Sequence, residues 1–370
     1  MLSAALSALR RAVGPRPAEP PWNTEELIRA ELFSVERLEQ HAASLAAAQR
    51  ISTHSIPRMS LAGRLRANEK ILLAAYRSIA AAVDENHPIT PAAEWLLDNY
   101  HLVEEQIREI REDLPASFYR MLPKLEGEPF RGYPRVFGVA WAFVAHTDSR
   151  FDPESLRRFV AAYQQVQPLN IGELWAVAIT LRIVLVENLR RAAASIVANR
   201  ATRQEADAFA DRLLGVAGAV AEPDALLRRA AGGGTFSAAF IVQLMQRLRD
   251  QDPEVTPALK WLEQRVAAQC TTTEELVRNE LQKQGASNVT VRSILTSMRL
   301  LSDLDWATFF ESVSLVDAAL RDGSEFAAMD FASRNLYRTA IEELSRGCAH
   351  SELAVAAARC LICPRRSARS

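Results

Sequence analysis

The 370-residue sequence has little of what marks several protein classes. Its 14 glycines are too few for a collagen-like chain or a loop-rich β protein. Its four cysteines are too few, in a chain of this length, to form a disulfide framework. We therefore expect a globular protein of a reducing compartment.

Strong charge and long apolar runs are also absent. The 44 basic and 45 acidic residues leave a formal net charge of −1, so no global field attracts nucleic acid or an anionic membrane. The two most apolar stretches, 136–145 and 174–186, are shorter than the roughly 20 residues that cross a bilayer. The sequence therefore predicts no nucleic-acid partner and no spanning helix in these stretches.

Helix signals, in contrast, are dense. A Thr or Asn followed three residues later by Glu is the pattern of a helix-capping box, and it occurs at Asn170, Thr202 and Thr272. A Thr or Asp before proline suits a helix start, and it occurs at Thr90, Asp152 and Thr256. No run alternates apolar and polar residues as a strand does. We expect an all-α fold, an array of antiparallel helices, with helices at about 24–49, 60–83, 91–113, 135–146, 153–167, 171–198, 203–221, 237–250, 257–269, 273–284, 288–303, 306–321, 331–346 and 351–361.

The predicted organisation has two helical halves. They cover residues 60–231 and 235–361, joined at Gly232–Gly234, after an N-terminal segment 1–59 and before a disordered tail 362–370. The stretch 90–96 returns at 256–262 with five identities in seven residues. An internal duplication and a coincidence between two helix starts both stay open as explanations.

The stretch 95–114 has the strongest helical periodicity. Apolar residues from Leu96 to Leu114 step by four and three positions, which predicts a buried stripe. The opposite face is polar, and its members are Asp98, His101, Glu105, Arg108 and Glu112. A solvated face with salt bridges and a partner-docking face are the two interpretations of this pattern.

A proline-rich loop follows at 114–134. At this length we expect it to pack down as an ordered loop or to serve as a contact surface. Its aromatic side chains are Phe118, Tyr119, Phe130 and Tyr133. Together with the polar face, Phe118, Tyr119 and Tyr133 make the candidate interaction surface, because aromatic side chains dominate interfaces.

Two chemical alternatives have weaker signals. Asp303 and Asp305 have the Asp-x-Asp spacing that holds a divalent metal in glycosyltransferases, although Asp305 also fits a helix cap. The C-terminal Cys348, His350, Cys360 and Cys363 could supply four zinc ligands, although their spacing is irregular. No phosphate-binding loop, serine elbow or His-Glu-x-x-His motif occurs. We therefore predict no catalytic residue, no metal site and no cofactor for this chain.

The stretch 95–115, WLLDNYHLVEEQIREIREDLP, resembles the N-terminal region of bacterial cyclic β-1,2-glucan synthases. Further matching segments extend the likeness over roughly residues 60 to 355. They are Phe118-Tyr119, 122–125, 132–136, 145–148, 172–176, 304–306, 309–311, 329–334 and Tyr337-Arg338.

The resemblance implies a helical, non-catalytic part of a large inner-membrane enzyme that builds and cyclises β-1,2-glucan. UDP-glucose and a divalent metal would serve the glycosyltransferase domain of that enzyme. The partners implied are its glycosyltransferase and membrane domains, with β-1,2-glucan as a competing ligand, at the cytoplasmic face of the inner membrane. Those domains are missing from this sequence, and the abrupt change after Ala358 predicts a truncated or frameshifted product.

Overall fold

The computed structural model describes residues 24–52, 60–214, 237–249, 262, 272–322 and 324–362. Within these residues the chain is all-α, which confirms the predicted fold class. The extended pairing in this part is limited to two isolated bridges, Ile51 with Leu125 and Lys124 with Pro134. Among the described helices, none combines the length and the apolar character needed to cross a bilayer.

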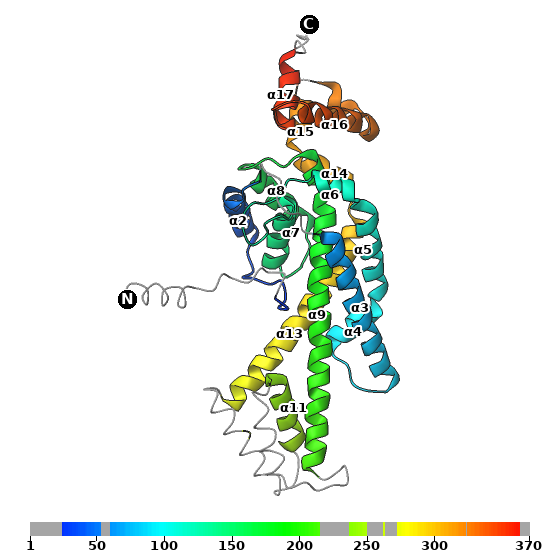
Figure 1. Ribbon diagram of the computed structural model, residues 1–370. Helices are drawn as coiled ribbons and strands as arrows, with labels where there is room; N and C mark the ends of the chain where they lie inside the picture. The colour runs from blue at the N-terminus through cyan, green and yellow to red at the C-terminus, as the bar shows by residue number, and fades with distance from the viewer. Residues whose placement is uncertain are drawn as a thin grey trace, which may run out of the picture. The chain divides into compact units, whose positions relative to one another are not determined.

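The helices keep close to the predicted positions (Figure 1). They are α2 (Val35–Ala48), α3 (Leu61–Asp84), α4 (Pro91–Asp98), α5 (Tyr100–Asp113), α6 (Ala116–Met121), α7 (Arg135–His146), α8 (Pro153–Gln164), α9 (Ile171–Leu213), α11 (Ala238–Arg249), α13 (Thr273–Asp303), α14 (Trp306–Val313), α15 (Leu315–Arg321), the 3₁₀ helix η2 (Glu325–Ala328), α16 (Phe331–Arg346) and α17 (Glu352–Ile362).

The described residues fall into two compact units, each drawn from distant stretches of the chain. The first unit comprises the described residues within 1–64, 106–185 and 297–370, and the second those within 65–105 and 186–296. Helices α3, α5, α9 and α13 contribute residues to both. The predicted joint at 232–234 lies outside the described residues, as do most of the second repeat copy and the tail after 362, so the two-halves division stays a prediction.

In the first unit, α2 packs on α7 and α8 (Figure 1). The α7 interior is almost wholly apolar, and ten of its twelve residues are buried. Asp152 caps α8 by accepting from the Ser155 N–H at 2.8 Å, as the Asp-Pro pattern predicted. Helices α15, α16 and α17 pack together at the C-terminal end of this unit.

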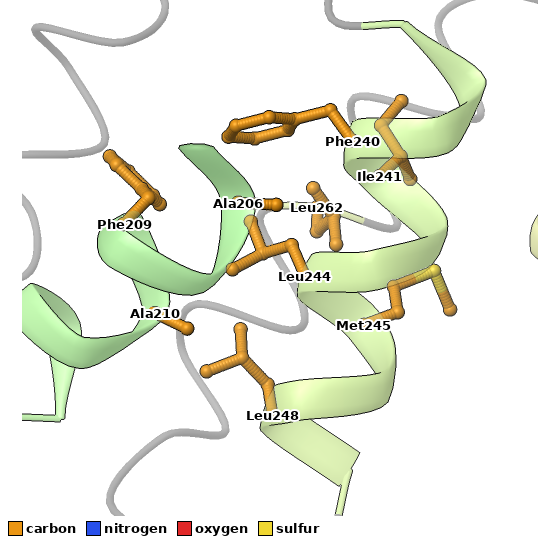
Figure 2. Close-up of a cluster of buried hydrophobic side chains, with 9 residues drawn as sticks. All are labelled: Ala206, Phe209, Ala210, Phe240, Ile241, Leu244, Met245, Leu248 and Leu262. Carbon is orange, nitrogen blue, oxygen red and sulfur yellow. The ribbon is translucent and has the colours of Figure 1, made fainter. Parts of the chain in front are cut away.

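The second unit contains an apolar cluster between the later part of α9 and α11. Figure 2 shows Ala206 and Ala210 of α9 on the side toward Leu244 and Leu248 of α11, with Leu262 beside Leu244; Phe209 and Phe240 also belong to the cluster. All of these side chains are buried, and the Phe209 and Phe240 rings lie 6.0 Å apart. Burial of this kind contributes about 25 cal/mol per Å² of apolar surface, so the cluster holds the two helices together.

Two predicted helices are divided by a capping side chain. The helix expected at 91–113 ends at Asp98, because the Asn99 side chain donates to the Trp95 carbonyl at 2.9 Å and competes with the helical backbone. The helix expected at 306–321 ends at Val313, where Ser314 accepts from the Asp317 N–H and starts α15. The predicted helix at 24–49 begins only at Val35, with Ser34 as its cap.

Two other predicted breaks are absent. The helices expected at 171–198 and 203–221 form one helix, α9, of 43 residues. No glycine or proline lies between 198 and 203, so the backbone hydrogen bonds continue through Thr202. The helices expected at 273–284 and 288–303 likewise join as α13 through Gly285. The capping boxes at Asn170 and Thr272 are confirmed by reciprocal hydrogen bonds with Glu173 and Glu275.

Candidate functional site

The predicted polar face is divided between two helices and two units. Asp98 ends α4, and the other four members lie on α5. Asp98, His101, Arg108 and Glu112 are exposed, and Glu105 is half-buried. Asp98, His101 and Glu105 belong to the second unit, whereas Arg108 and Glu112 belong to the first.

The apolar stripe on the other side of α4 and α5 is buried as predicted up to Ile110, whereas Leu114 at its end is half-buried. The buried members are Leu96, Tyr100, Val103, Ile107 and Ile110. Tyr100 stacks on Tyr76 of α3 at a ring distance of 4.3 Å. Burial raises the pKa of the Tyr100 hydroxyl to about 12.

The loop 114–134 is ordered and packs down, as the length argument predicted. It includes the short helix α6, and its later part is tied by backbone hydrogen bonds to the stretch after α2. Ser52 N–H donates to the Lys124 carbonyl, and Glu126 N–H donates to the Arg50 carbonyl, each at 2.9 Å. Gly132 has a φ of 82°, a conformation that favours glycine because it has no Cβ.

The loop aromatic side chains have different surroundings. Tyr133 was predicted at the surface, but it is only 7% exposed and stacks on Phe137 at 5.3 Å, so it belongs to the core. Phe130 packs against Phe137 and Trp141. The sequence could have indicated this, because Tyr133 directly precedes the apolar α7. Phe118 and Tyr119 are half-buried on α6.

Lys124 fixes the end of α6. Its Nζ lies 4.4 Å from the Tyr119 ring centroid and donates to the carbonyl oxygens of Tyr119 and Leu122 at 2.5 and 2.7 Å. These carbonyls lie at the helix end, where no intrahelical donor remains. The ammonium therefore holds Tyr119 in a defined position on the surface of the first unit.

A buried ion pair joins the starts of α7 and α9. Arg135 donates through Nε to Glu173 Oε1 at 2.8 Å and through Nη2 to Glu173 Oε2. Its remaining donors reach Gln167 Oε1 and the Pro168 carbonyl, each at 3.1 Å. Glu173 also accepts from the Asn170 N–H within its capping box. Burial lowers the pKa of Arg135, and the Glu173 hydrogen bonds outweigh that effect, so the pKa is raised overall.

The same network extends to α2 and α8. The Tyr163 hydroxyl donates to Gln49 Oε1 at 2.6 Å, and Gln167 Nε2 donates to the Gln49 carbonyl at 3.0 Å. Burial raises the pKa of Tyr163 to about 12, so its hydroxyl remains a donor at neutral pH. One hydrogen-bonded network inside the first unit thus connects five polar residues: Arg135, Glu173, Gln167, Tyr163 and Gln49.

A second buried network joins α14, α15 and α16. The guanidinium of Arg338 donates to both carboxylate oxygens of Asp317 and to Glu311 Oε1 at 2.8 Å. Arg334 also donates to Glu311, at 2.6 Å. The Arg338 guanidinium lies 4.9 Å from the centroid of Phe310, and this arrangement adds a cation–π contact. Each charge is therefore matched within the packing of the three helices.

The second unit has a comparable group. Glu187 of α9 accepts from Arg190 and Arg191 at 3.0 and 2.9 Å, and from Asn68 of α3 at 2.9 Å. All four side chains are buried. Buried charges without partners cost several kcal/mol, so this arrangement fixes the register of α3 against α9.

Of the residues considered as metal ligands, Asp305 has a structural role, and two of the cysteines have side chains that the structure does not describe. Asp305 caps α14 by accepting from the N–H groups of Ala307 and Thr308 and from the Thr308 hydroxyl. Hydrogen bonds from Thr308 lower the pKa of its carboxyl group. Cys348 is exposed, but the side chains of Cys360 and Cys363 lie outside the described residues. In the part that the structure describes, no group of three or more His, Cys, Asp or Glu side chains is placed to hold a metal ion.

These features define an all-α chain whose buried charges hold helices together. Comparison with known proteins adds its family relationship. The chain is 42% identical, over 331 residues, to the cyclic β-(1,2)-glucan synthase NdvB of Rhizobium meliloti (strain 1021). The aligned region covers 88% of this chain and 11% of that protein. No family model matches the chain.

The resemblance to cyclic β-1,2-glucan synthases is thereby confirmed. The aligned region accounts for about a ninth of the curated relative, so the relationship concerns one region of such an enzyme.

The close approach around Gly138 of α7 generates a prediction. A Cβ at this position would lie 2.7 Å from Gln49 Nε2 and 3.2 Å from Leu125 Cδ1. Gly138→Ala should displace Gln49 and leave the Tyr163 hydroxyl without its acceptor, a loss of about 1–3 kcal/mol that exceeds the roughly 1 kcal/mol gain in helix propensity. Urea unfolding monitored by circular dichroism would measure the net decrease.

Gly285 of α13 is the matched control. No atom lies within 4 Å of a Cβ built there, so Gly285→Ala should stabilise the protein by up to about 1 kcal/mol. If both substitutions shift unfolding in the same direction, the close packing of Gly138 against Gln49 is not a constraint.

Proposed function

We propose that this chain is a non-catalytic helical region of a cyclic β-1,2-glucan synthase and that it acts as a scaffold or interaction domain. The observation that carries the proposal is the 42% identity to NdvB over 88% of this chain. In the whole enzyme, glucosyl transfer from UDP-glucose with a divalent metal would be the work of other domains. This chain would lie at the cytoplasmic face of the inner membrane when joined to them.

The roles of the buried charges support a structural function. Arg135, Glu173, Glu187, Asp317 and Arg338 each bond to partners within the described structure. Catalytic acids and bases need a pKa near the working pH and access to substrate. Paired, buried side chains of this kind instead fix helix packing, which is what a scaffold requires.

The surface that we propose for contact lies on α5 and α6 of the first unit. Arg108 and Glu112 are exposed near the end of α5, and α6 begins three residues after Asp113. The half-buried rings of Phe118 and Tyr119 provide aromatic surface for contact with a partner, and Lys124 holds Tyr119 in place. Such a combination of aromatic groups and rim charges fits a protein partner, for which the glycosyltransferase or membrane domains are the natural candidates.

Stacking of β-1,2-glucan on the same rings is the competing use. We favour protein contact because the charges of Arg108 and Glu112 suit a polar interface rim better than a neutral sugar. A small glycosyltransferase using Asp303 and Asp305 is less favoured, since Asp305 is occupied as a helix cap.

The non-catalytic role predicts an enzymatic result. Purified chain incubated with UDP-glucose and Mg²⁺ or Mn²⁺ should release no UDP above the rate without protein, because Asp305 of the Asp-x-Asp pair is engaged as the cap of α14. Reproducible UDP release that is lost in Asp303→Ala would overturn the proposal and favour the glycosyltransferase alternative.

The contact surface predicts an effect in a full-length synthase that contains this region. Arg108→Glu and Tyr119→Ala should each lower glucan yield by roughly threefold to tenfold, because truncation of an interface anchor weakens assembly. Circular dichroism of the isolated chain should show that both variants remain helical.

Arg150→Glu is the control for charge reversal, since Arg150 is exposed between α7 and α8 and lies outside the proposed surface. Tyr119→Phe is the control for ring loss, because it keeps the ring over Lys124. Normal yield with both test variants would contradict the proposal. Binding of β-1,2-glucan to the isolated chain, lost in Tyr119→Ala, would favour the sugar-binding alternative.

A further inference from the structure

Residues 24–34, named the strap here, lie across the C-terminal end of α7. Ala30 N–H donates to the Ala145 carbonyl at 2.9 Å, and Phe33 N–H donates to the His146 carbonyl at 3.1 Å. The last carbonyls of a helix have no intrahelical donor, so the strap satisfies two of them. Ile28 anchors the strap, with only 3% of its surface exposed.

Three aromatic rings fasten the strap to α2 and α7. Phe33 of the strap stacks on His146 of α7, with ring centroids 4.0 Å apart and an interplanar angle of 9°. His41 of α2 meets His146 edge to face at 4.5 Å and Phe33 at 5.5 Å. His146 Nδ1 lies 2.7 Å from the Glu31 carbonyl, so Nδ1 carries a proton and donates to the strap.

The charged groups around the two rings are engaged with one another. Within and beside the strap, Arg29 pairs with Asp148 at 3.3 Å and Glu31 pairs with Arg37 at 3.4 Å. From α2 and α8, Arg158 pairs with Glu36 and Glu39. None of these ion pairs includes His41, whose ring contacts are with Phe33 and His146.

A proton on His41 would therefore be poorly accommodated. Burial lowers the pKa of His41 below 6.5, and the neighbouring His146 lowers it further. A charge on the His41 imidazole would also lie against the His146 ring, whose centroid is 4.5 Å away, instead of against a carboxylate.

We propose that protonation of His41, which packs edge to face on His146, releases the strap from the end of α7 on acidification. This inference is independent of the proposed function in glucan synthesis. Histidine is the side chain that changes charge in the range of about pH 5 to 8, which makes His41 the suitable sensor.

The direction of the pH effect follows from the linkage of protonation to docking. His41 in the docked state has a pKa below its ordinary 6.5, so the released state binds protons more readily. The stabilisation is fully present above pH 6.5 and is lost as the pH falls through the lowered pKa. Glu36 and Glu39 have pKa values lowered from 4.5 by hydrogen bonds, so their protonation falls in a separate, more acidic window.

The test is a pH titration of the full chain by NMR and hydrogen exchange. The His41 ring should titrate below 6.5. Over the same range, exchange protection of the Ala30 and Phe33 amides, corrected for intrinsic rates, should fall by roughly threefold to tenfold between about pH 8 and pH 5. Amides in α8 should keep their protection and so report that the unit stays folded.

His41→Phe keeps an aromatic ring but removes the titrating group. It should preserve protection of the strap at neutral pH and abolish its loss on acidification. His87→Phe is the matched control, because His87 lies in the turn after α3, and it should leave the pH response unchanged.

Three results would overturn the inference. One is a His41 ring that titrates at or above 6.5. Another is strap protection that stays constant while His41 titrates. The third is an unchanged pH response in His41→Phe.

Discussion

The packing of the first unit depends on the buried pair of Arg135 and Glu173. Each residue lies in the first turn of its own helix, and the pair brings the starts of α7 and α9 together. Both groups are buried, so removal of either leaves the other as an uncompensated buried charge. The remaining donors of Arg135 bind the segment after α8, and Tyr163 and Gln167 carry the network to the end of α2. Four helices are thus located by one set of polar contacts.

Buried charged side chains also fix the packing of helix α9 at other points along its length. In the first unit its Arg182 donates to Gln106 of α5 and pairs with Glu109 at 2.9 Å. In the second unit its Glu187 gathers Arg190, Arg191 and Asn68. Apolar burial supplies most of the free energy of packing, but it is non-directional. Buried charges restrict the register, because a helix that slides leaves them unpaired.

Local signals in the sequence predicted local structure well. The stripe from Leu96 to Ile110 and the capping box of Asn170 with Glu173 depend on residues that are close in sequence, and the structure confirms both. The divisions at Asn99 and Ser314 were missed, because a polar side chain within an apolar pattern can either face solvent or cap the backbone. The burial of Tyr133 was not predicted for a related reason: it depends on how the loop folds onto α7.

The partner of Arg135 is 38 residues away, and no periodic pattern indicates a pair formed by tertiary packing. Family resemblance supplied the functional context, which no motif in the chain provides.

The most direct test of this account is a double-mutant cycle on Arg135 and Glu173, with opening free energies of α7 and α9 measured by native-state hydrogen exchange. Glu173→Gln keeps the capping oxygen, and Arg135→Met keeps the apolar stem. Arg135→Met alone should lower the opening free energy by about 3–5 kcal/mol, because it leaves a buried carboxylate uncompensated. The double variant should lose less than the sum of the single changes, with a coupling of about 1–3 kcal/mol. Single effects that add to within about 0.5 kcal/mol would contradict the central role of this pair.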